Sequence, residues 1–205
     1  MKKVIVISLL SAFVFSFSFR ETKPFVILVD AAHGGKDLGF VLEDQEISEK
    51  DITLNFTRRL IKLSESDPEI KIISTRYNDE FLNLKQRLSL VKNYNPDLFI
   101  SVHLDGFLSS AEEGLSLKVD PNSPQSEKSF TLAKSIINRL QAFGSSTVNP
   151  QVGEFDSYLL QKSDCPALLL NLGNMANTTD LGFINTDEKI DLLCKDLIKA
   201  IKVNQ

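Results

Sequence analysis

The chain has 205 residues, of which 42% are hydrophobic and 24% are charged, and its formal net charge is -4 at pH 7. This length and balance suit one well-cored globular domain and leave little room for a second. A negative net charge without a basic run argues against nucleic-acid binding, because phosphate neutralisation needs a face rich in Lys and Arg.

The N-terminal residues are expected to form an export signal outside the folded domain. Two lysines precede an apolar run over residues 4–17, which is too short to span a bilayer comfortably and is typical of a secretory signal. Small serines near its end place the expected cleavage after Ser18, so residues 1–18 are interpreted as a signal peptide. An uncleaved membrane anchor is the alternative. The folded domain is then expected over residues 24–205, in the periplasm or associated with the cell wall.

The first half of the domain alternates between apolar runs and amphipathic runs. Ser48 is expected to cap the first helix, and Asp51 would complete a capping box three positions later. Period-2 and continuous apolar patterns predict strands, and the 3.6-residue period predicts helices. The expected strands cover 25–30, 70–75 and 98–103, and the expected helices begin near 48 and near 84, the second closing at 95–96.

The second half continues the alternation with one difference. Residues 114–119 alternate between apolar and polar, which favours an edge strand or an antiparallel strand. Residues 144–155 are polar and are expected to form a loop. The remaining expectations are a helix over about 126–142, strands around 157–161 and 166–171, and a last helix over about 186–202.

This order of elements predicts a single α/β domain. Strands that alternate with helices form a mostly parallel sheet, here expected to have six strands, with helices on both faces. In such sheets, ligands bind beyond the carboxyl ends of the strands. Functional side chains are therefore sought where the buried strands end.

The two histidines of the chain each follow a buried strand closely. His33 comes after the strand at 25–30, and His103 ends the strand at 98–103. Glu49 opens the first helix, and a helix start returns to the same edge of the sheet. Taken singly, each histidine is more simply a structural residue with satisfied hydrogen bonds, and Glu49 is a charge favoured at a helix N-terminus.

Taken together, these three side chains predict a catalytic zinc site. Two histidines and one glutamate are a known ligand set for catalytic Zn²⁺, which keeps its fourth position open for water. Asp30, Asp37 and Asp105 lie close in sequence to the ligands and are candidates to orient them. The alternative for these aspartates is a role in turns or helix caps.

Four segments of the chain resemble the zinc-dependent N-acetylmuramoyl-L-alanine amidases of the amidase-3 type. The resemblance covers nearly all of the domain, in order. It implies hydrolysis of the amide between the lactyl group and L-alanine in bacterial peptidoglycan, with zinc held at His33, Glu49 and His103. The segments are VILVDAAHGG, SEKDITLN, ISTRYNDEFLNLKQRLSLVKNYNPDLFISVH and CPALLLNLGNMANTTD.

The sequence departs from this family at the residue that matters most for catalysis. The resemblance places a general-base glutamate at the end of the last core strand, where this chain has Asn171. An amide cannot take a proton at neutral pH. General-base assistance is typically worth ~10² to 10⁴ in rate, so reduced or lost activity is expected. An amide at this place could still donate or accept a hydrogen bond at the site.

Other departures lie nearby. The family usually has Pro-Gly where this chain has residues 31–32, Ala-Asn where it has Leu104 and Asp105, and an aromatic residue where it has Asn174. A substitute base is conceivable, with Asp105, Glu154 and Asp156 as the candidates. Otherwise these carboxylates are solvated loop residues.

Three hypotheses follow for the function. The first is an active secreted amidase whose partners are the stem peptide and glycan of peptidoglycan. The second is a pseudoenzyme of the same fold that binds peptidoglycan or a protein without cutting, and the third is a metal-free relic, which three retained ligands disfavour. The sequence shows no exposed heptad pattern or apolar stripe that would favour a permanent dimer, so a monomer is expected. It does not identify a protein regulator. Cys165 and Cys194 could pair after export or remain buried thiols.

Overall fold

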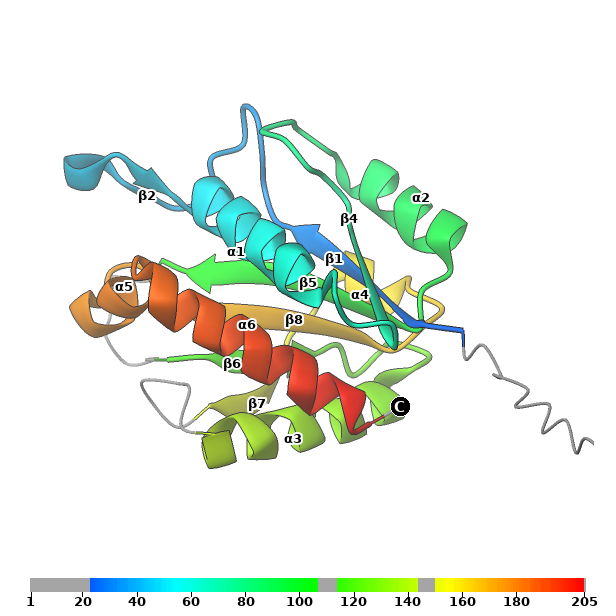
Figure 1. Ribbon diagram of the computed structural model, residues 1–205. Coiled ribbons are helices and arrows are strands. Elements are labelled where there is room, and N and C mark those ends of the chain that lie inside the picture. Colours follow the sequence, from blue (N-terminus) through cyan, green and yellow to red (C-terminus); the bar gives the residue numbers. More distant parts are fainter. Residues whose placement is uncertain (1–22, 107–113, 144–149, 205) are drawn as a thin grey trace, which may run out of the picture.

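The computed structural model describes residues 23–106, 114–143 and 150–204, shown in colour in Figure 1. The predicted signal peptide over residues 1–18 lies outside the described residues. Within the described part of the chain, no helix combines the length and the apolar character needed to cross a bilayer.

A six-stranded sheet forms the centre of the molecule, in the order β4-β1-β5-β8-β6-β7. The neighbours β4, β1, β5 and β8 are parallel, whereas β6 runs antiparallel to β8 and parallel to β7. This confirms the predicted α/β domain with a mostly parallel sheet. The strands are β1 (Phe25–Ala31), β4 (Ile70–Ser74), β5 (Leu98–Asp105), β6 (Ser116–Val119), β7 (Gln151–Glu154) and β8 (Ala167–Asn174).

Helices cover both faces of the sheet, and the side-chain alternation of β1 shows why both need covering. Ile27 and Val29 belong to the larger hydrophobic cluster, whereas Leu28 between them belongs to the smaller one on the opposite face. The larger cluster lies under α1 (Glu49–Ser64), α3 (Ser126–Phe143) and α6 (Asp187–Lys202), and the smaller under α2 (Leu84–Tyr94) and α4 (Tyr158–Gln161).

Four short elements complete the described fold. The antiparallel pair β2 (Val41–Leu42) and β3 (Ile47–Ser48), joined by the 3₁₀ turn η1 (Glu43–Gln45), leads from β1 into α1. The short helix α5 (Thr178–Ile184) follows β8, and the Asn177 side chain caps its start by accepting from the backbone N–H groups of Thr179 and Asp180.

Two expectations for residues 144–161 were wrong. The segment expected as a strand at 157–161 is the helix α4, because Ser157 caps it by accepting from the backbone N–H of Leu160 and the two buried leucines fit one turn. The sixth strand is instead β7, inside the segment expected to be a loop. A short apolar run does not distinguish a strand from a helical turn, whereas an edge strand can be largely polar.

The expected capping box at the start of α1 is not formed. Ser48 is the N-cap residue, but its hydroxyl donates to the Asp51 carboxylate at 2.5 Å and accepts no backbone N–H. A complete capping box begins α2 instead, where Asn83 accepts from the Gln86 backbone and Gln86 accepts from the Asn83 backbone. The cap on α2 fixes the loop that precedes it.

Cys165 and Cys194 are both buried free thiols. Cys165 packs in the smaller hydrophobic cluster and Cys194 in the larger one, so the sheet separates them. The disulfide that the sequence left open is therefore absent, and both cysteines act as small core residues.

Candidate metal centre

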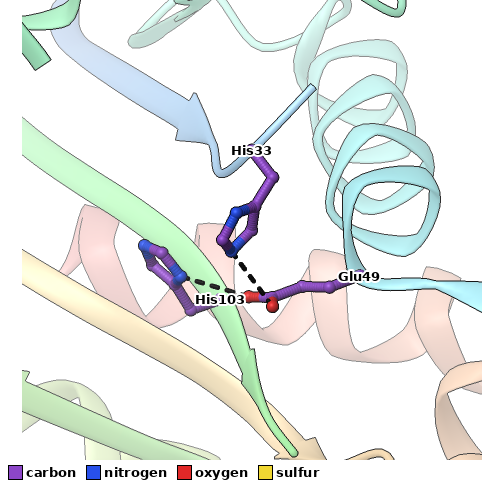
Figure 2. A group of neighbouring side chains, drawn as sticks. All are labelled: His33, Glu49 and His103. Carbon is purple, nitrogen blue, oxygen red and sulfur yellow. Dashed lines mark hydrogen bonds and ion pairs between the residues drawn. The ribbon is translucent and has the colours of Figure 1, made fainter. Parts of the chain in front are cut away.

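The three predicted ligands meet at one edge of the sheet. Figure 2 shows His33 on the loop after β1, His103 on β5 and Glu49 at the start of α1, with both imidazoles directed at the carboxylate. The edge is where parallel strands end, as expected for an α/β site. Segments separated by up to 70 residues in the sequence thus supply one cluster.

Glu49 contacts both histidines. Its Oε2 lies 3.0 Å from His33 Nε2, and its Oε1 lies 3.1 Å from His103 Nδ1. One ligand atom from each of the three residues can be chosen so that all lie within 4.8 Å of one another. The imidazole rings are nearly perpendicular, with centroids 5.4 Å apart.

The Glu49 carboxylate is buried and held by the main chain on both oxygens. Oε2 accepts from the backbone N–H of Phe40 at 3.1 Å, and Oε1 accepts from the backbone N–H of Leu104 at 3.0 Å. The side chain is 5% exposed, so these contacts fix its direction. A carboxylate set in this way presents its remaining lone pairs to the space between the histidines.

Burial and ion pairing set the ionisation of the cluster. Burial would raise the pKa of Glu49, but hydrogen bonds from His103 and His33 outweigh it and hold that pKa well below its usual range. Burial would lower the pKa of His33, but Glu49 and Asp37 outweigh it and raise that pKa above its usual value. The buried glutamate is therefore an anion that attracts positive charge.

Among the three nearby aspartates, only Asp37 contacts a predicted ligand in the described structure. Asp37 Oδ1 lies 3.0 Å from His33 Nδ1, which directs Nε2 toward Glu49. Asp30 is buried and binds Thr75, Arg87 and Ser101. Asp30 therefore stabilises the fold around the end of β1 and does not orient either histidine.

This donor set fits a zinc ion. Ligand atoms on a tetrahedral zinc lie roughly 3.3–3.5 Å apart, given bonds of about 2.0–2.2 Å. The two Glu49–histidine separations, 3.0 and 3.1 Å, involve different oxygens of the carboxylate, and one ligand atom from each residue lies within 4.8 Å of the others, so side-chain adjustments of about 1 Å bring the set to that spacing. The backbone of Gly39 lies against the cluster, and only a residue without a side chain fits there. A Cβ at this position would lie 2.6 Å from Glu49 Oε2 and 2.7 Å from His33 Cδ2.

Asn171 lies on β8 opposite His103 in the strand register. Its amide nitrogen donates to the Asp105 carboxylate, and its carbonyl oxygen accepts from the backbone N–H groups of Asp105 (3.1 Å) and Gly173 (3.2 Å). The residue is 3% exposed, so its carbonyl oxygen is committed to the main chain. Asp105 also pairs with Lys118 at 3.3 Å.

Two of the candidate substitute bases are at the wrong edge of the sheet. Because β6 is antiparallel to β8 and β7 is parallel to β6, the carboxyl end of β7 lies at the edge where β8 begins. Glu154 ends β7 and Asp156 follows it, so neither reaches the cluster. The sequence predicted that these two carboxylates could lie near the cluster, and the direction of β7 shows that this prediction was wrong. Asp105 remains a carboxylate at the correct edge.

A cleft of about 290 Å³ opens beside the two histidines. One wall is the β4–α2 loop and the first residue of α2, which carry Phe81, Leu82 and Leu84. Phe81 and Leu84 are 41% and 53% exposed. The cleft thus places an accessible, partly apolar wall next to the candidate ligands.

Sequence reasoning missed two buried arginines that hold the loop carrying His33. Arg76 and Arg87 donate to main-chain oxygens of residues 31–33, and they are 0% and 4% exposed. The signal was present, since Arg76 lies two residues after the end of the strand β4, where a buried charge needs a partner. Its partners are backbone carbonyls, which a sequence pattern does not reveal.

Comparisons with known proteins agree with this architecture. Residues 27–203 match the protein-family model described as amidase-3, N-acetylmuramoyl-L-alanine amidase. The chain is 38% identical over 95 residues to the N-acetylmuramoyl-L-alanine amidase AmiC of Escherichia coli O6:H1, covering 46% of this chain and 22% of AmiC. It is 32% identical over 189 residues to the probable cell wall amidase LytH of Staphylococcus epidermidis, covering 91% of this chain and 60% of LytH.

A solved structure gives the same result. The CwlD amidase from Clostridioides difficile, determined in complex with the GerS lipoprotein, superposes with a TM-score of 0.77 at 28% identity. The match covers 87% of this chain and 96% of CwlD. The chain spans about a fifth of the length of AmiC and 60% of the length of LytH.

Proposed function

Because the chain belongs to the N-acetylmuramoyl-L-alanine amidase family, we propose that it acts on the amide joining the lactyl group to L-alanine in bacterial peptidoglycan. The observation that carries this proposal is the meeting of His33, Glu49 and His103 beside an open cleft. The proposal includes export, because the substrate lies outside the cytoplasm and residues 1–18 have the composition of a leader.

The three clustered side chains would hold one Zn²⁺. Zinc at this place would supply Lewis acidity toward the scissile carbonyl and acidify a water molecule. His33 and His103 would each offer a neutral nitrogen to the ion, and Glu49 would supply a compensating negative charge. Asp37 keeps His33 in the tautomer that leaves Nε2 available. The cleft wall at Phe81 and Leu84 would orient the substrate.

The weak step is proton transfer. The amide of Asn171 cannot remove a proton, and its carbonyl oxygen already accepts two backbone N–H groups. We therefore propose turnover reduced by roughly 10² to 10⁴ relative to a site with a carboxylate in this place. The same observation favours a second candidate function, a protein that binds peptidoglycan without cutting it.

Metal analysis and peptide release test both candidates. The purified chain should bind about one zinc, and His103→Ala should bind none. Incubation with purified peptidoglycan should release stem peptides slowly; a chelator should stop the release, and added zinc should restore it. Zinc-loaded protein that sediments with peptidoglycan and releases no peptide would establish the non-catalytic candidate. Full zinc content in His103→Ala would remove that residue from the centre.

A further inference from the structure

His33 has an unusual backbone conformation for a residue other than glycine. Its φ angle is 60°, in the left-handed region that disfavours residues with a Cβ. The residue also lies beyond the end of β1, so its carbonyl has no strand partner. Something outside the sheet must hold this backbone for the imidazole to point at Glu49.

Two guanidinium groups supply that support. Arg76 donates from Nε to the carbonyl of Ala31 at 2.8 Å and from Nη2 to that of Ala32 at 2.9 Å. Arg87 donates from Nη1 to Ala31 at 3.0 Å and from Nη2 to the carbonyl of His33 at 2.5 Å. Three consecutive carbonyls therefore each accept from a buried arginine.

Arg87 is the one that reaches the ligand itself. Its Nε donates to the carbonyl of Leu82 at 3.0 Å, and its Nη1 pairs with the buried Asp30. All three of its nitrogens thus have acceptors, and they join the His33 loop to the β4–α2 loop and to β1. The three nitrogens of a guanidinium group lie in one plane and donate in different fixed directions. A lysine has a single ammonium nitrogen and cannot reach all of these acceptors at once.

We propose that Arg87 is a positioning residue for the metal ligand His33, a role that rests on the proposed metal centre. Its guanidinium holds the His33 carbonyl and thereby fixes the left-handed backbone from which the imidazole meets Glu49. Because Leu82 lines the cleft and accepts from the same side chain, Arg87 also ties the position of the cleft wall to that of the ligand.

The test compares two Arg→Lys variants. Arg58 also donates through two nitrogens to a backbone carbonyl, that of Tyr77, but it is exposed on α1 and touches no part of the centre. Arg87→Lys is expected to lose about 10- to 100-fold in Zn²⁺ affinity, measured by competition with a chromophoric chelator. It should also shift the visible bands of bound Co²⁺. Arg58→Lys should match the unmodified chain in both.

A second variant covers the case in which Arg87→Lys does not fold. Arg87→Ala leaves space for methylguanidinium, which should restore Zn²⁺ affinity and the Co²⁺ bands, whereas methylammonium at the same concentration should not. Circular dichroism follows the fold throughout. If neither variant folds under any of these conditions, Arg87 serves folding alone and the proposal is overturned.

Two further outcomes separate this proposal from the metal centre. A folded Arg87→Lys with unchanged affinity and unchanged Co²⁺ bands would overturn the positioning role and leave the centre intact. An unmodified chain that binds neither Zn²⁺ nor Co²⁺ would overturn the centre, and the role of Arg87 with it.

Discussion

At the scale of single residues, the centre depends on groups that crowd around Glu49. Both of its oxygens are occupied by a histidine and by a backbone N–H, so the carboxylate cannot move without breaking contacts on both sides. Preorganisation of this kind would favour binding of the proposed metal ion, because the three side chains would not need to be ordered again on binding.

Gly39 gives a direct test of this crowding. A methyl group at this position would meet Glu49 Oε2 at 2.6 Å, and the φ angle of +65° disfavours alanine as well. We expect Gly39→Ala to lower zinc affinity at least roughly tenfold. Gly182→Ala is the matched control, since a Cβ there meets nothing within 4 Å. Equal zinc affinity in the two variants would show that the backbone at Gly39 is not part of the centre.

The hydrogen bond between Asn171 and Asp105 predicts the outcome of restoring a carboxylate. Asn171→Glu should raise peptide release above that of the native chain, but the new carboxylate faces Asp105, and like charges repel. The double variant Asp105→Asn, Asn171→Glu removes the repulsion and should release peptide faster still, approaching a gain of ~10² to 10⁴.

Initial rates of peptide release from purified peptidoglycan, with zinc content measured for each protein, check this order. Asp105→Asn alone serves as the control. A native chain that already works at ordinary enzyme rates and is unaffected by Asn171→Glu would contradict the account of an impaired site.

At the scale of elements, α6 anchors the larger core. Leu193 is 0% exposed and Leu192, its neighbour in sequence, is 48% exposed. Leu193→Ala should destabilise the protein by about 2–5 kcal/mol because it leaves a cavity, whereas Leu192→Ala should stay within about 0.5 kcal/mol. Urea unfolding of both variants measures the difference. Equal midpoints would mean that α6 does not pack as described.

The elements were predictable where a long periodic pattern supported them. The last helix was expected over 186–202 and is observed at Asp187–Lys202, because its apolar positions repeat over four turns. The helix α4 and the strand β7 were not predictable, because four residues carry no period and tertiary packing decides their conformation. The predicted capping box of α1 was wrong because the Ser48 hydroxyl donates to the Asp51 side chain instead of accepting from a backbone N–H.

At the scale of the whole molecule, the meeting of His33, Glu49 and His103 was predictable because of a rule about sheets. His33 follows β1 and His103 lies near the end of β5, and because these two strands are parallel neighbours, their carboxyl ends lie at the same edge of the sheet. Glu154 and Asp156 were wrong as candidate bases because β7 runs antiparallel to β8. The direction of β7 follows from its pairing with β6, which the sequence does not reveal. The support from Arg76 and Arg87 was not predictable, because carbonyl acceptors exist in every residue and leave no mark in the sequence.

The separation of the two cysteines by the sheet makes a prediction about the intact fold. Burial raises the pKa of the Cys165 thiol to about 11 and raises that of Cys194 as well. At pH 8 the native protein should therefore react with no equivalents of a thiol reagent, and after unfolding without reductant it should react with two. A protein without reactive thiols after unfolding would contain the disulfide that the structure excludes.

The central claim is that His33, Glu49 and His103 hold one metal ion, and anomalous scattering tests it most directly. Crystals of the zinc-loaded protein, measured on both sides of the zinc absorption edge, should show a single strong peak. The account predicts that peak at about 2.0–2.2 Å from a nitrogen of each histidine and an oxygen of Glu49. A peak elsewhere, or none at full zinc loading, would contradict it.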